Sequence, residues 1–168
     1  MAAKLSPKKV KKLVAQARKK KEPPDLRKAD LKGQDLRKFN LQNSNLQGAD
    51  LRKANLEDAN LRKANLENAN LEKANLRKAN LSWAKLIKAN LEDAVLRDAD
   101  LRWANLGKTS LDGADLRRVD LRDANLTGTN LRKANLNGAN FRRAKLKKVD
   151  LSKANYDQHT EWPKGFKP

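Results

Sequence analysis

The chain repeats a five-residue unit, Ala-Asn-Leu followed by two mostly charged or amide residues, and this repeat limits the folds it can adopt. The frame runs without insertion from Leu26 to Tyr156, which makes 27 repeats. Such strict periodicity predicts a solenoid, in which a repeat buries its apolar residues only by stacking on its neighbours. In the most regular stretch, leucine stands at every fifth position: Leu56, Leu61, Leu66, Leu71 and Leu76.

The five-residue spacing fits a strand-and-turn unit and excludes an α-helix. At ~100° per residue, five residues advance ~500° around a helix, so successive leucines would rotate by ~140° and never form one face. Ala-Asn-Leu instead alternates inward, outward and inward as in a short β-strand, and the next two residues turn the chain. We therefore expect coils of short parallel strands spaced ~4.8 Å apart, with these leucines as the core. The spacing alone leaves three-sided and four-sided coils open.

Residues 1–22 differ from the repeats and are predicted to form a basic amphipathic helix. Ser6 and Pro7 are a good N-cap and first helical residue, and Pro23 is expected to end the helix. Leu13 belongs to a narrow apolar face that would cap the first coil, because terminal repeats need a cap to stay soluble. The alternative is a free basic arm for an anionic partner. The candidate contacts of such an arm are Lys8, Lys11, Lys12 and Lys19.

The A(D/N)Lxx run over Leu26–Tyr156 resembles the pentapeptide repeat family. The following pattern, Y-D-x-x-T-x-W-P-x-G-F, resembles the tail that closes many bacterial members. The resemblance implies an all-β fold, a right-handed quadrilateral parallel β-helix with four pentapeptides per coil, here preceded by a short N-terminal α-helix. Residues 23–156 would then form about 6.75 coils, a rod ~32 Å long. Residues 157–168 would be an aromatic cap, with Trp162 and Phe166 over the last coil.

Composition restricts the partners and the chemistry. Lys and Arg number 39 against 20 Asp and Glu, a net charge of +19, which favours anionic partners such as nucleic acid. No apolar run is long enough for a membrane span and there is no cysteine, so we expect a soluble cytoplasmic protein. His159 is the only histidine and lies in the expected cap. With no nucleophile motif, phosphate loop or metal-ligand spacing, we expect no enzyme activity, no cofactor, no metal and no small-molecule substrate.

In a coil of 20 residues the outward positions sort onto four sides, and one side gathers aromatic and basic residues. Trp83 and Trp103 are 20 residues apart, so they would stack in adjacent coils. Arginines 20 residues apart would form a ladder, and an anionic partner would relieve their repulsion, about 0.8 kcal/mol per pair in water at ~5 Å. Alternatively, the tryptophans cover each other and the arginines only solubilise the rod. The candidate residues for a polyanion or other partner are Arg62, Lys63, Trp83, Arg102, Trp103, Arg122, Arg142 and Arg143.

Two functions remain open from the sequence. The first is a non-enzymatic scaffold that binds another protein or its own copies, and the second is a binder of nucleic acid or another polyanion. A membrane anchor is not expected, because the apolar face of the N-terminal helix carries no aromatic residue. Some members of the family protect DNA gyrase and confer quinolone resistance by resembling DNA. That role needs a strongly negative surface, so a net charge of +19 argues against it.

Overall fold

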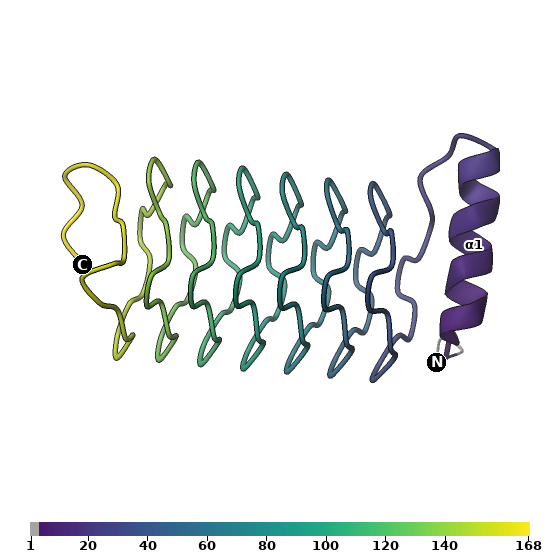
Figure 1. Cartoon of the computed structure of the whole chain (residues 1–168), viewed down its shortest axis with the longest axis horizontal. Coiled ribbons are helices and arrows are strands. Elements are labelled where there is room, and N and C mark those ends of the chain that lie inside the picture. The colour runs from purple at the N-terminus through teal and green to yellow at the C-terminus, as the bar shows by residue number, and fades with distance from the viewer. Residues whose placement is uncertain (1–3) are drawn as a thin grey trace.

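The computed structural model describes residues 4–168 as a rod of stacked coils with one helix, α1 (Pro7–Lys19), across its N-terminal end (Figure 1). Parallel backbone bridges join Asn55 to Asn75 and Asn75 to Val95, and this step of 20 residues recurs along the rod. Each coil therefore contains four pentapeptides, one for each side. Only three residues separate consecutive turns, so within residues 4–168 the pairing consists of single bridges and no longer strand forms.

All repeats except the last, centred on Tyr156, close with the same two-residue turn, whose backbone conformation was not predicted from the sequence. The carbonyl of Leu76 accepts a hydrogen bond from the Ala79 N–H at 3.0 Å, as in a β-turn. The second turn residue has a positive φ in all 26 turns from Lys28 to Lys153, and 21 of these residues are not glycine. An L-residue in this left-handed region costs roughly 1–2 kcal/mol. The stacking of the coils must offset that strain in turn after turn.

The Asn or Asp before each leucine stabilises the turn that follows. Asn75 Oδ1 accepts a hydrogen bond from the backbone N–H of Arg77 at 3.1 Å, and the equivalent bond recurs in most repeats. Asn75 Nδ2 also donates to Asn55 Oδ1 of the preceding coil at 3.1 Å. The short side chains of Asn and Asp reach the backbone two residues on. This explains why they occupy the position in 23 of the 27 repeats.

The core of the rod consists of stacked leucines and alanines, as predicted. The five leucines named for the core, from Leu56 to Leu76, are all fully buried. Thr109 and Thr129 stand where most repeats have alanine, and their hydroxyls donate to the carbonyls of Leu86 and Leu106 at 2.6 and 2.7 Å. These two buried hydroxyls are therefore satisfied, and the core tolerates them.

Helix α1 begins as predicted but ends for a different reason. Ser6 Oγ accepts a hydrogen bond from the Lys9 N–H at 3.3 Å, and Pro7 is the first helical residue. The helix ends at Lys19, so the prediction that Pro23 ends it is wrong. Lys21 adopts a φ of 59°, and the next N–H, of Glu22, bonds back to the Ala17 carbonyl at 2.9 Å. This left-handed C-terminal motif closes the helix before the prolines are reached.

Helix α1 lies against the first coil and covers it with its apolar face. Val10 and Val14 are buried, and Leu13 packs against the core. The first coil has no preceding coil to satisfy its carbonyl groups, and the N-terminal segment supplies donors instead. The backbone N–H of Leu5 bonds to the Asp30 carbonyl at 2.9 Å. Arg18 Nη2 bonds to the Asn40 carbonyl at 2.6 Å, which protects the open edge. Lys12 and Lys19 remain exposed.

The C-terminal segment covers the last coil with aromatic residues, also as predicted. Trp162 stacks on the buried Phe141, with ring centroids 4.9 Å apart and planes 7° apart, and Phe166 packs against Trp162 at 5.5 Å. The backbone N–H of Phe141 donates to the Glu161 carbonyl at 2.7 Å. The bridge from Asn140 to Glu161 spans 21 residues instead of 20, so the tail adds one residue before it pairs.

Candidate functional site

The two exposed tryptophans meet on the side of the rod where the sequence placed them. The rings of Trp83 and Trp103 stack with centroids 5.1 Å apart and planes 13° apart, which confirms the expected contact between adjacent coils. They remain 48% and 41% exposed. Both occupy left-handed turn positions, with φ of 62° and 57°, so the backbone holds the rings outward in a fixed direction. The guanidinium of Arg102 lies 5.5 Å from the Trp103 ring centroid.

The arginines of the predicted ladder are held by carboxylates rather than left free. Arg102 donates to both carboxylate oxygens of Asp100 at 2.9 and 2.8 Å. Arg122 does the same to Asp120 at 2.9 and 2.6 Å. Each pair lies within one Asp-Leu-Arg turn. This local signal was present in the sequence but was not recognised, because it depends on the turn bringing residues two apart side by side.

The pKa values of the acidic partners follow from these contacts and from burial. Burial acts to raise the pKa of the Asp100 carboxyl, but the hydrogen bonds from Arg102 outweigh it and the pKa is lowered. A side-chain hydrogen bond from Arg143 lowers the pKa of Asp123, whose carboxylate it meets at 2.7 and 2.8 Å. These carboxylates are therefore ionised at neutral pH. They neutralise much of the positive charge on this side.

The remaining candidates on the tryptophan side differ from one another. Arg142 Nη1 lies 3.4 Å from a carboxylate oxygen of Glu161 in the C-terminal segment. In the described part of the chain, Arg62 and Lys63 have no carboxylate oxygen within 4 Å. Lys63 precedes Trp83 by one coil, and its N–H bonds to the Ser82 carbonyl at 2.9 Å. The structure thus brings the predicted residues onto one side but leaves only this one pair of basic residues unpaired.

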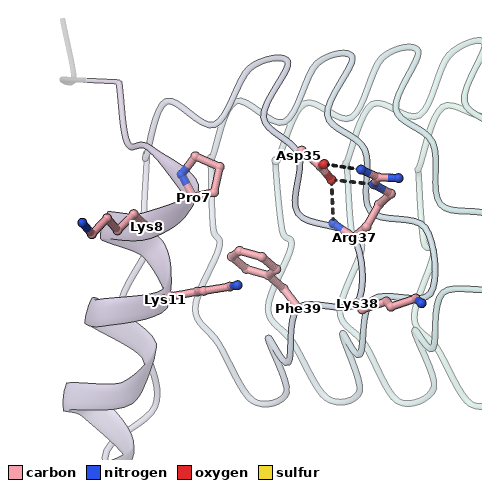
Figure 2. Close-up of a pocket in the computed structure, with 7 residues that line it drawn as sticks. All are labelled: Pro7, Lys8, Lys11, Asp35, Arg37, Lys38 and Phe39. Carbon is pink, nitrogen blue, oxygen red and sulfur yellow. Dashed lines mark hydrogen bonds and ion pairs between the residues drawn. The ribbon is translucent and has the colours of Figure 1, made fainter.

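A groove between α1 and the first coil brings together basic residues from both elements. Lys8 and Lys11 of α1 and Lys38 and Phe39 of the first coil line a cavity of about 590 Å³. Figure 2 shows Lys11 pointing toward Phe39, whereas the amines of Lys8 and Lys38 point away from the groove. The ammonium of Lys11 lies 5.0 Å from the centre of the Phe39 ring. Arg37, also on the wall, is held by Asp35 at 2.6 Å. Phe39 replaces the usual alanine here, because there is no further coil above it and the larger ring fills the space beneath the helix.

Charged residues are distributed unequally over the four sides of the rod. The sequence analysis did not predict this imbalance. One side consists of the repeats centred on every twentieth residue from Leu26 to Leu146. Its outward residues include eight Lys or Arg against two acidic residues. On the tryptophan side, six Lys or Arg stand against three acidic residues. On the remaining two sides the numbers are seven against seven and seven against six. Sorting every side by the 20-residue step would have found this imbalance.

Residues 4–168 offer neither a cluster of metal ligands nor a membrane-spanning helix. Residues 4–168 contain no cluster of three or more His, Asp or Glu side chains arranged to hold a metal ion. No helix in that part of the chain is long and apolar enough to cross a bilayer. His159 is exposed in the C-terminal segment, where its backbone N–H donates to Asp157 Oδ1 at 3.1 Å.

The coil geometry agrees with the family comparison. The family model described as "Pentapeptide repeats" matches eight copies, over residues 25–62, 54–93, 94–132 and 124–155. The chain therefore belongs to the pentapeptide repeat family. No functionally curated protein matches the sequence.

Solved structures resemble the chain to different degrees. A pentapeptide repeat protein from the Arabidopsis thaliana thylakoid lumen is 35% identical over 59% of this chain and 69% of that one, with a TM-score of 0.58. The pentapeptide repeat protein Rfr23 from the cyanobacterium Cyanothece 51142 is 24% identical over 90% and 98%, with a TM-score of 0.48. QnrB1, a plasmid-mediated fluoroquinolone resistance protein, is 15% identical over 80% and 84%, with a TM-score of 0.43. The last two similarities support no functional conclusion. The family and the first structure imply a right-handed β-helix.

Proposed function

We propose that this protein is a non-enzymatic scaffold that binds another protein chain, a partner or a second copy of itself, at the Trp83–Trp103 stack. The observation that carries the proposal is the exposure of this pair: each ring is more than two-fifths exposed in the middle of a rigid rod. Exposed tryptophans are unfavourable in water, and tryptophan and arginine are the residue types most enriched at binding hot spots.

The surroundings of the pair favour a preorganised protein contact. Arg102 and Arg122 are already held by bidentate hydrogen bonds, so they would lose little side-chain freedom when a partner docks. The tryptophan rings are fixed by their mutual stacking and by the backbone conformation of their turns. A partner with an apolar centre and a polar rim would fit this arrangement.

The alternative role of this side, binding a polyanion through its arginines, is weakened by the same ion pairs. Three of the arginines face aspartates at 2.6 to 2.8 Å, so their charge is largely neutralised before any ligand arrives. Only Arg62 and Lys63 among the described candidates of this side lack such a carboxylate partner. A protein contact at the tryptophans therefore agrees better with the geometry than a nucleic acid contact at the arginines does.

A site-specific cross-linking experiment tests the proposal. A photoreactive residue at Lys63, directly beside Trp83 in the preceding coil, is compared with the same residue at Lys133, on the opposite side of the rod. Both positions are second turn residues with nearly the same φ, 58° and 54°. We expect protein adducts in cells from position 63 only, and loss of those adducts when Trp83 and Trp103 are both replaced by serine.

The mass of the adduct separates the two kinds of partner. An adduct of twice 18.9 kDa, together with a dimer in sedimentation equilibrium, identifies a second copy. Another mass identifies a different protein. Equal adducts from positions 63 and 133, or adducts that persist without the tryptophans, would show that the stack is not the contact.

A further inference from the structure

We propose that a second surface, distinct from the tryptophan stack, binds the phosphodiester backbone of a nucleic acid. This surface, the lysine face, consists of the outward residues of the repeats centred on Leu86, Leu106, Leu126 and Leu146. Its basic residues are Lys85, Lys88, Lys108, Lys145, Lys147 and Lys148. All six side chains are exposed.

The lysine face contains no acidic residue, whereas each other side of the same coils does. Between Leu86 and Leu151 the other three sides carry four, two and three Asp or Glu residues. Within residues 4–168, Lys73 is the one lysine with a carboxylate oxygen within 4 Å, and it lies on another side. The six lysines of the lysine face therefore keep their full charge.

Like charges at this spacing destabilise the rod. Lys88 and Lys108 occupy the same turn position in adjacent coils, where unit charges ~5 Å apart repel by about 0.8 kcal/mol in water before salt and side-chain movement reduce it. The other sides avoid this cost by placing acids in the column, as Arg77 and Glu57 do at 2.8 Å. Lysines concentrated on one side without acidic neighbours do not stabilise the fold. We therefore attribute their concentration to the binding of an anionic ligand.

The spacing of the charges fits a phosphate backbone. From Leu86 to Leu146 the face extends over three coil steps, ~14 Å at ~4.8 Å per step. A nucleic acid duplex carries one charge per ~1.7 Å of its axis, so that length presents about eight phosphate charges to six lysines. Lysine binds phosphate as a point charge without a fixed geometry, which suits contact with a backbone irrespective of sequence.

A membrane surface fits the same charges less well. Binding to anionic lipid is strengthened by apolar side chains that enter the bilayer. The apolar residues of α1 that could do so, Val10 and Val14, are buried against the first coil. On the lysine face itself the one large apolar outward residue is Ile87, which is half-buried. The rod therefore offers positive charge without an apolar segment that could enter a bilayer. This favours the phosphate backbone of a nucleic acid over a membrane surface.

The test compares two variants with the same loss of charge. In the first, Lys88, Lys108, Lys147 and Lys148 are replaced by glutamine. In the matched control, Lys32, Lys53, Lys133 and Lys153, on a side with no net charge, are replaced in the same way. Each set contains one first turn residue and three second turn residues, and all six second turn residues have φ between 54° and 60°. Circular dichroism melting curves verify that both variants fold.

Binding is measured by fluorescence anisotropy with a labelled 20-base-pair DNA duplex and the corresponding single strand, at ~50 to ~200 mM salt. We expect the first variant to bind at least ~10-fold more weakly and the slope of log affinity against log salt to fall by about two to four, since each phosphate contact contributes ~0.9 for a duplex and ~0.7 for a single strand. The control should stay within about twofold of the unmodified protein.

Three results would overturn the proposal. The first is an absence of binding to either DNA at ~50 mM salt. The second is equal weakening in both variants, which would assign binding to overall charge. The third is that the protein binds polyglutamate but not DNA, and that this binding depends on the same four lysines. That result would identify the lysine face as a binding site for an acidic protein. None of these outcomes bears on the tryptophan stack.

Discussion

Replacing Phe141 by leucine restores the repeat at that position, yet we expect it to destabilise the protein. Phe141 and Tyr156 are the two central repeat positions without leucine. Substitutions toward a consensus commonly stabilise by about 0.5–2 kcal/mol, so a repeat-based expectation predicts a gain. The structure predicts the opposite, because the fully buried Phe141 ring stacks on Trp162 at 4.9 Å.

The magnitude follows from what the substitution removes. A stacked aromatic pair contributes about 0.5–1.5 kcal/mol beyond its buried area. Leucine is also smaller than phenylalanine and leaves a gap beneath Trp162, which adds a cavity term of about 1 kcal/mol. We therefore expect the free energy of unfolding to fall by about 1–3 kcal/mol. The C-terminal cap should loosen first, because it is this contact that holds Trp162 against the last coil.

Urea unfolding followed by far-UV circular dichroism measures this loss as a lower midpoint. The control is Tyr156→Leu, which restores the repeat at a residue that is 45% exposed and meets Trp162 only edge-on, at 5.4 Å. This control substitution should lower the free energy of unfolding by less than half as much as Phe141→Leu does. A double-mutant cycle of Phe141→Leu with Trp162→Leu should give a coupling of about 0.5–1.5 kcal/mol. A higher midpoint for Phe141→Leu, or strict additivity in the cycle, would refute the reasoning.

Three further outcomes are expected. Leu76→Asp should abolish the cooperative melting transition, because Leu76 is fully buried and an unpaired buried carboxylate is costly, whereas Arg77→Ser should change the free energy of unfolding by less than ~1 kcal/mol. Lys133→Gly should raise the melting temperature, since glycine relieves a left-handed strain of roughly 1–2 kcal/mol and adds an entropic cost of only about 0.5–1 kcal/mol; a lower melting temperature would contradict the strain. Hydrogen bonds from Arg37 lower the pKa of Asp35 from 3.8 to about 2, so its contribution to stability is present above pH 3.8 and is lost as pH falls toward 2; Arg37→Gln should reduce that loss in acid unfolding curves.

Much of the architecture could be predicted because the repeat encodes it locally. A period of five residues excludes a helical face and places Ala and Leu inside, irrespective of what lies elsewhere in the chain. The cap residues Leu13 and Trp162 could be named because an open end of the stack must be covered. Predicting that Trp83 stacks on Trp103 required one further assumption, a coil of 20 residues. The backbone bridges have this spacing.

The candidate site was predicted less well, because charge counted along the sequence is not the charge that a surface presents. Arg102 and Arg122 appeared as a free ladder, but the turns bring Asp100 and Asp120 within bonding distance. Arg18, in the basic N-terminal helix, likewise points back to the rod and donates to the carbonyl of Asn40.

The sequence by itself determined the inside and outside of the rod, since burial follows from periodicity alone. The tertiary structure decided which outward charges cancel and which remain, because ion pairing depends on distances of a few ångströms between turns and coils. It also decided where α1 ends, through the backbone conformation of Lys21 rather than through the prolines. Two surfaces remain for binding, the tryptophan stack and the lysine face. On these surfaces, neighbouring side chains do not cover the outward aromatic rings or neutralise the outward lysines.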